Sequence, residues 1–79
     1  MTPFLQSLIE GGPGYVVKVD GIEISVSPVG YDEESLIAFQ AVADQIIEHA
    51  GDGFYLYPLP HRSSDYGRDY YDGISIVQE

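Results

Sequence analysis

Residues 15–27 have the sequence YVVKVDGIEISVS, in which apolar and polar residues alternate on both sides of Asp20-Gly21. Alternation with a period of two is typical of strands that bury one face. An Asp-Gly pair between two such runs predicts a β-hairpin, because a type I′ turn requires positive φ at both of its central residues. The register that this turn predicts pairs Tyr15 with Val26, Val17 with Ile24, Val19 with Ile22 and, on the opposite face, Lys18 with Glu23.

The segment that follows the hairpin predicts a long helix over 32–50. Asp32 is suited to the N-cap, and the next two acidic residues lie in the first turn, where the helix dipole favours negative charge. Gly51 is expected to end the helix. The predicted buried stripe consists of Leu36, Phe39, Ala43, Ile46, Ile47 and Ala50, widened by Ile37 and Val42. The opposite face carries Glu33, Gln40, Asp44 and Glu48, and the helix contains no Lys or Arg.

Shorter elements are expected at the two ends of the chain. Residues 2–10 predict a short helix capped by Thr2, and the sequence GGPG at 11–14 ends it. Residues 54–57, FYLY, predict a strand. A further strand region is expected over 70–77, after a long polar loop.

Together these elements predict an α+β fold of one domain, 1–79. A three- or four-stranded antiparallel sheet, made of the hairpin 15–27 and the C-terminal strands, packs one face against the helix 32–50. The short N-terminal helix closes an edge. The predicted core consists of Val17, Val19, Ile22, Ile24, Val26, Leu36, Phe39, Ala43, Ile46, Ile47, Leu56, Ile74 and Ile76.

The composition excludes several classes of protein. Thirteen Asp and Glu against three Lys and Arg give a formal net charge of −10, so we expect no direct binding to nucleic acid or to anionic membranes. The absence of Cys excludes disulfides, thiolate nucleophiles and sulfur-ligated metals. No apolar run approaches the length of a membrane span, and the first ten residues lack a basic signal region. We therefore expect a cytoplasmic protein.

No catalytic or metal-binding motif is specific enough to predict an enzyme. A Ser–His–Asp set can be drawn from His61, Ser63, Ser64 and Asp65, but adjacency in sequence says little about triad geometry. Asp65, Asp69 and Asp72 lack the alternating spacing of a calcium loop. His49 lies at a helix C-terminus, where a cation is favourable. We expect no enzyme activity, cofactor or metal, and an enzymatic alternative would centre on His61.

Two groups of residues are candidates for binding a partner. The first is acidic: Glu33, Glu34, Asp44 and Glu48 on the helix, with Asp65, Asp69 and Asp72 as a second patch. The second is aromatic: Tyr66, Tyr70 and Tyr71, in or beside the polar loop, because tyrosine is enriched at binding hot spots. Tyr55 and Tyr57 fit a half-buried sheet equally well. An acidic face is also an ordinary solubility device, but the scarcity of Lys and Arg favours a basic partner.

In size and charge the chain resembles the small inhibitors that phages direct at host nucleic-acid machinery, the anti-CRISPR and anti-restriction DNA mimics. It also resembles acidic immunity proteins and antitoxins. The resemblance implies a non-enzymatic inhibitor that binds a basic, nucleic-acid-engaging protein surface by charge mimicry, in the host cytoplasm if the chain is phage-encoded. The alternative is an immunity protein or adaptor that binds a protein through a tyrosine-rich surface. An exposed strand edge makes a homodimer possible.

Overall fold

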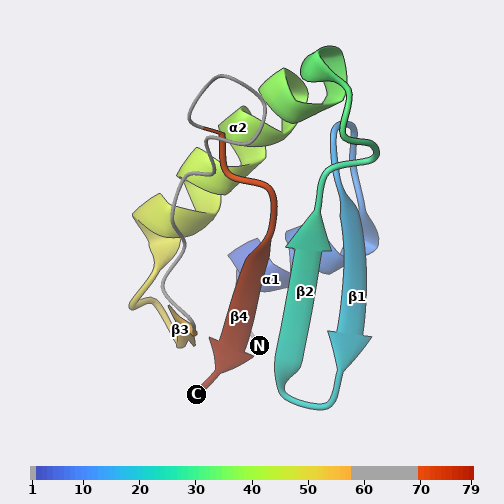
Figure 1. The fold of residues 1–79 in the computed structure, drawn as a ribbon. Coiled ribbons are helices and arrows are strands. Elements are labelled where there is room, and N and C mark those ends of the chain that lie inside the picture. Colours follow the sequence, from blue (N-terminus) through green and yellow to red (C-terminus); the bar gives the residue numbers. More distant parts are fainter. Residues whose placement is uncertain (1, 58–69) are drawn as a thin grey trace.

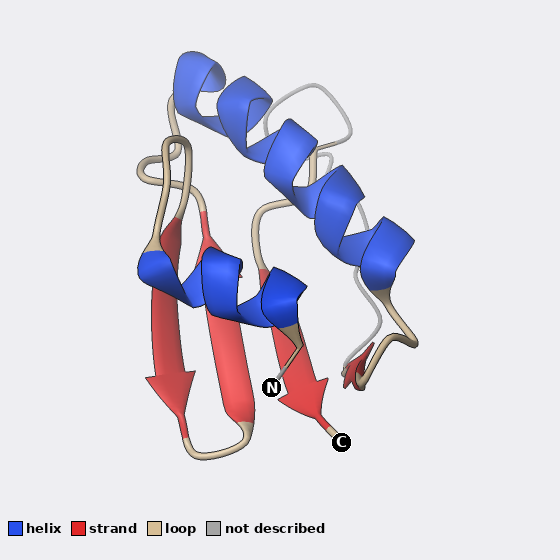
Figure 2. Ribbon diagram, turned by 180° about the vertical axis from the view of Figure 1, so that it is seen from behind, coloured by secondary structure: helices blue, strands red, loops and turns tan. Residues whose placement is uncertain are grey.

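The structure is a computed structural model that describes residues 2–57 and 70–79. The elements, in chain order, are α1 (Pro3–Glu10), β1 (Val16–Asp20), β2 (Glu23–Ser27), α2 (Glu33–His49), β3 (Phe54–Leu56) and β4 (Ile74–Gln78). Within the described residues the four strands form one antiparallel sheet in the order β1-β2-β4-β3 (Figure 1). Both helices lie on the same side of this sheet (Figure 2). The predicted α+β fold is confirmed, but the short helix α1 covers part of this face and does not close an edge of the sheet as predicted.

The hairpin is present, but the predicted register is wrong by two residues. Its central residues are Gly21 and Ile22, because Asp20 lies opposite Glu23. Gly21 has a φ of 63°, and no other residue type in the described chain has a positive φ. Glycine at the first central position with positive φ is typical of a type II′ turn, whereas the predicted turn would have required positive φ at Asp20 as well. The observed pairs are Val16 with Ser27, Val17 with Val26, Lys18 with Ser25, Val19 with Ile24 and Asp20 with Glu23.

The shift in register changes which hairpin residues are buried. Ile22 lies in the turn and is 65% exposed, and Val19 on the edge strand is 46% exposed, so the prediction that both belong to the core is wrong. Asp20 now faces Glu23, and two like charges directly opposite each other destabilise a strand pair. Lys18, which was predicted to face Glu23, faces Ser25 instead.

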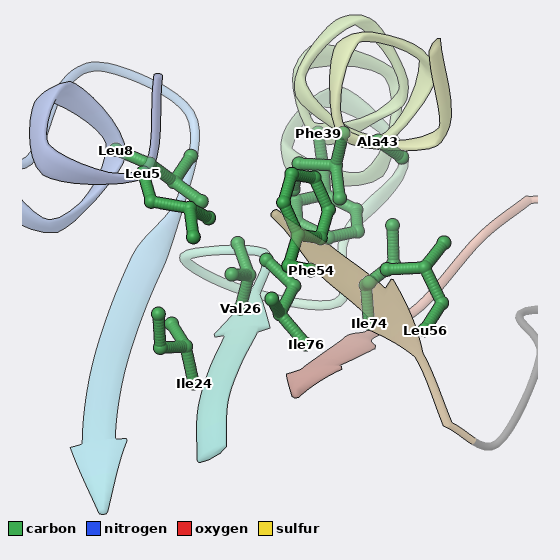
Figure 3. Packing of buried hydrophobic residues seen from close by; sticks show 11 residues of the cluster. Leu5, Leu8, Ile24, Val26, Phe39, Ala43, Phe54, Leu56, Ile74 and Ile76 are labelled. Carbon is green, nitrogen blue, oxygen red and sulfur yellow. The ribbon is translucent and has the colours of Figure 1, made fainter. Parts of the chain in front are cut away.

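The core lies between the sheet and the two helices. Leu5 and Leu8 of α1 pack over the β1–β2 half, while Phe39 and Ala43 of α2 pack over the half formed by β4 and β3 (Figure 3). Most of the predicted core is confirmed, with Val17 and Ile47 only partly buried. Four further residues are buried that are not in the predicted core: Leu5, Leu8, Phe54 and Tyr70. Neither described helix has the length and apolar character needed to cross a membrane.

Candidate partner-binding surface

The outward side of α2 carries an acidic stripe, which we define as Glu33, Glu34, Asp44 and Glu48. At 100° per residue, Glu33, Asp44 and Glu48 lie within about 60° of one another around the helix. Glu34 lies about 40° beyond Glu48 on the same side, and the stripe extends about 22 Å along the axis. All four side chains are exposed. The structure therefore brings the four predicted acidic residues of the helix onto one surface.

The orientation of this stripe is fixed by the opposite side of α2. Leu36, Phe39, Ala43 and Ile46 are fully buried, the last three in the core shared with the sheet, so α2 cannot rotate without exposing them. Two residues of the predicted buried stripe are exceptions: Ala50 is exposed, and the side chain of Ile37 is 50% exposed. At 100° per residue Ile37 lies between Asp44 and Glu48 around the helix, one turn after Glu33. An exposed isoleucine therefore lies within the acidic stripe.

Asp32 fixes the first turn of α2 and thereby the position of the stripe. One carboxylate oxygen of Asp32 accepts a hydrogen bond of 3.2 Å from the backbone N–H of Ser35, and the other accepts one of 2.7 Å from the Ser35 hydroxyl. The capping role predicted for Asp32 is confirmed. These two hydrogen bonds favour the charged carboxylate and hold the pKa of Asp32 below its ordinary value of 3.8.

We expect the cap at Asp32 to make a pH-dependent contribution to stability. Because the pKa is lower in the folded than in the unfolded chain, the contribution is complete well above pH 3.8 and is lost as the pH falls through the folded value. An Asp32→Ala variant should therefore unfold more easily than the wild type at pH 7 and approach it in acid. Urea titrations at pH 7 and pH 3 check this, and a difference in stability that stays constant with pH would contradict it.

The acidic stripe has no compensating charge on its own helix. Where both partners are described residues, the ion pair seen is that between His49 Nδ1 and Asp52 Oδ2, at 3.6 Å. Glu34, Asp44 and Glu48 have no hydrogen-bond or ion-pair partner within the described chain. Lys18, the one Lys or Arg within the described residues, lies on β1 and not on α2. The charges of Glu34, Asp44 and Glu48 therefore act together on the solvent beside α2.

Gln40 joins the edge of the acidic stripe to the C-terminal part of the chain. Its Oε1 accepts a hydrogen bond of 2.8 Å from the backbone N–H of Tyr71, and its Nε2 donates one of 2.8 Å to the carbonyl of the same residue. Nε2 also donates to the carbonyl of Leu36, at 2.8 Å. One side-chain amide thus replaces a pair of strand hydrogen bonds. The exposed Asp72, which follows Tyr71, is thereby held beside α2.

The remaining predicted binding residues have different positions. Tyr70 is buried, which leaves its ring little surface to offer a partner in this conformation, and Tyr71 is half-buried. Asp72 is exposed. The other residues named from the sequence lie outside the described residues: His61, Ser63, Ser64, Asp65, Tyr66 and Asp69.

Three tyrosines of the described residues are exposed: Tyr31, which precedes α2, and two at β3, Tyr55 and Tyr57. Tyr55 points away from the buried Phe54 and Leu56, and Tyr57 continues the alternation, with its backbone N–H donating to the carbonyl of Ser75 at 3.2 Å. Tyr57 is 71% exposed. Both rings therefore belong to the face of the sheet turned away from the helices, beside the half-buried Ser75 and Val77 of β4. We call Tyr55 and Tyr57 the tyrosine edge.

A half-open groove of about 190 Å³ lies between α1 and α2. It is lined by Phe4, Ser7, Leu8, Tyr15, Val42 and Gln45. The Tyr15 hydroxyl donates a hydrogen bond of 2.7 Å to the carbonyl of Leu8, and burial raises the pKa of Tyr15 above its ordinary value of 10.0. The lining contains no carboxylate, imidazole or amine, so it offers no acid–base pair. Among residues 2–57 and 70–79, no three His, Asp or Glu side chains gather as a metal site.

No protein family, no curated protein and no solved structure matches this chain, so the assignment of a function depends on its own residues.

Proposed function

We propose that this protein is a non-enzymatic inhibitor that binds a basic, nucleic-acid-engaging surface of a partner protein through the acidic stripe of α2. The observation that supports the proposal is the exposure of Glu34, Asp44 and Glu48 on one helix face, with no Lys or Arg among residues 2–57 and 70–79 paired with them. An exposed row of carboxylates on a rigid helix presents negative charge in fixed positions, as the phosphates of a duplex do. The inhibitor would occupy a groove that otherwise binds nucleic acid.

The net charge of the whole chain supports the same partner. A formal charge of −10 accelerates encounter with a cationic surface and disfavours encounter with DNA, RNA or anionic lipid. Binding of this kind weakens steeply as salt rises, because exposed charges are screened over about 8 Å at physiological ionic strength.

Ile37 distinguishes the stripe from a face that serves solubility alone. A purely solvated helix face has no need of an isoleucine, and Ile37 has half of its side-chain surface in water. Apolar side chains surrounded by charge supply the desolvated centre of many interfaces, where the rim carries the polar contacts. We therefore place Ile37 at the centre of the proposed contact, with the carboxylates around it.

The test compares two triple variants that change the net charge by the same amount. The stripe variant is Glu34→Gln, Asp44→Asn, Glu48→Gln; the control is Glu10→Gln, Glu23→Gln, Glu79→Gln, whose residues are exposed and lie off α2. Partners captured on the immobilised wild-type chain at low salt are identified by mass spectrometry and challenged with duplex DNA. We expect the stripe variant to bind on the order of 100-fold more weakly, at about 1 kcal/mol per lost charge contact, and DNA to displace the partner.

Either of two results would refute charge mimicry by α2. Equal weakening in both triple variants would show that net charge alone matters, and unchanged binding by the stripe variant would show that the stripe is not the contact. Two results together support the proposal. The wild type loses the partner at high salt, and the control triple variant binds the partner nearly as tightly as the wild type does.

The tyrosine edge favours a second candidate function, an immunity protein or adaptor that binds a protein partner. Exposed tyrosines supply contact area at a low cost in rotamer entropy. This alternative predicts that the double variant Tyr55→Ala, Tyr57→Ala loses the partner while the stripe variant keeps it. It also predicts a shallow dependence of binding on salt.

A further inference from the structure

The outer edge of β1 offers unpaired backbone groups to another strand. β1 is the terminal strand of the described sheet, and four of its five residues are exposed. Gln78 donates its backbone N–H to the carbonyl of Ile22 at 3.0 Å, so the hydrogen-bonding groups of the Ile22 backbone point toward β4. Because the N–H and C=O groups of successive strand residues point to opposite edges, those of Glu23 point toward β1.

The outward-directed groups of β1 follow from the same alternation. Asp20 and Lys18 lie opposite Glu23 and Ser25 and direct their backbone groups inward, toward β2. Val17 and Val19 therefore direct their N–H and C=O groups outward, away from the sheet. An edge with free hydrogen-bonding groups and exposed valines is a template for strand pairing unless charge or a covering element blocks it.

The charges on β1 select both the partner strand and its register. Lys18 faces Ser25 within the sheet and so lacks an acidic cross-strand partner, while Asp20 faces the like charge of Glu23. If β1 pairs antiparallel with β1 of a second copy, with Val19 opposite its counterpart, Lys18 lies opposite Asp20 of the second copy, twice by symmetry. Two alternative registers differ from this one by two residues. One places Lys18 opposite Lys18 of the second copy, and the other places Asp20 opposite Asp20. Like charges directly opposite each other disfavour both of those registers.

The same register also brings together two exposed apolar residues of β1. Val19, which is 46% exposed, lies opposite Val19 of the second copy. Helix α1 crosses the sheet near the start of β1 in both views (Figures 1 and 2). An axis at Val19, toward the other end of the strand, therefore keeps the two α1 helices apart on their common side.

We propose that two copies of this chain associate through β1 about a two-fold axis at Val19, so that the four described strands of each copy form one continuous sheet. The interface is a short strand pair, so the association is weak and concentration-dependent. This interface uses no residue of the acidic stripe, and the dimer presents two stripes at once.

Cysteine crosslinking tests the register directly, because the natural chain contains no Cys. Directly opposed residues of an antiparallel pair have Cα atoms about 5.5 Å apart or closer, within the range of a disulfide. A Val19→Cys variant should form a covalent dimer under mild oxidation. A Val16→Cys variant is the matched control, since its two sulfurs would lie about 20 Å apart along the strands and should not react. Both positions are exposed, so both variants should keep the wild-type circular dichroism.

Charge exchange tests the pairing of Lys18 with Asp20. Sedimentation equilibrium over a concentration series should show that Lys18→Asp weakens the dimer at least about tenfold, because two acids then face each other twice. The double variant Lys18→Asp, Asp20→Lys restores opposite charges across the axis and should recover wild-type association. Recovery is specific to the proposed register, since in the register with Lys18 opposite Lys18 the same double variant places aspartate opposite aspartate.

Several outcomes would overturn the dimer while leaving the proposed function intact. These are a wild-type chain that stays monomeric over the whole series at high salt, crosslinking of Val16→Cys as readily as Val19→Cys, or a double variant as weak as Lys18→Asp. Salt separates the two proposals, because two copies each of charge −10 repel and salt screens that repulsion. Self-association should strengthen with salt, whereas the binding of a basic partner should weaken.

Discussion

Replacing Gln40 with alanine should lower the free energy of unfolding by about 2 kcal/mol and the Tm by about 10 °C. The loss leaves the N–H and the C=O of Tyr71 without their side-chain partner in a part-buried position. An unsatisfied polar group of this kind costs more than the net value of the hydrogen bond that it loses. Thermal unfolding followed by circular dichroism gives the Tm, and urea titration gives the free energy.

Gln45→Ala is the matched control for this prediction. Gln45 lies on the same helix, is exposed, and should change stability by less than about 0.5 kcal/mol when truncated. Hydrogen exchange adds a local measurement, because the Tyr71 amide should lose protection in the Gln40 variant even under conditions in which the domain stays folded. Equal stability of the two variants would show that the amide bridge contributes nothing.

Phe54→Ala should have the largest effect of any single substitution considered for this chain, about 4 kcal/mol. Phe54 is fully buried, although β3 contributes only three residues to the sheet. Its ring stacks with that of Phe4 at a centroid distance of 6.1 Å, so the truncation empties space between β3 and α1. A domain of this size has about 4–12 kcal/mol of stability in total, and the variant should therefore be largely unfolded near 50 °C or below.

Two further variants at this strand separate the cavity from other causes. Phe54→Leu keeps much of the volume and should cost about 1.5 kcal/mol. Tyr55→Ala removes a larger side chain from the exposed side of the same strand and should cost less than about 0.5 kcal/mol. A Phe54→Ala variant that unfolds at the same urea concentration as Tyr55→Ala would contradict the central position of Phe54 in the core.

Local signals in the sequence were sufficient for both helices, their N-caps and the hairpin strands, but the last strand is Ile74–Gln78 and not the predicted 70–77. Thr2 accepts a hydrogen bond from the backbone N–H of Leu5 at 3.2 Å and Asp32 caps α2, as the capping rules predict. The hairpin register was missed because Asp20-Gly21 is compatible with two turn positions, and placing Gly21 first avoids a positive φ at an aspartate. The alternation of the strands is the same in both registers, since a shift of two residues leaves each side chain on its face.

Long-range contacts were beyond the sequence pattern. The hydrogen bonds between Gln40 and Tyr71 join residues 31 positions apart, and nothing in the helical periodicity distinguishes Gln40 from the other polar residues of α2. Ile37 was assigned to the buried stripe because it is apolar, but its position around the helix places it on the acidic side. The burial of Tyr70 likewise depends on tertiary packing and not on local alternation.

The place of β4 in the sheet has a consequence for how the protein is made. β4 lies between β2 and β3, yet the ribosome synthesises it after both of them. Until residues 74–78 emerge, no strand connects β2 with β3. The edges of β2 and β3 that pair with β4 in the folded sheet stay open during that time. Productive folding is therefore a late, cooperative event on the growing polypeptide. During that interval, mutual repulsion between acidic nascent chains on one polysome opposes their aggregation.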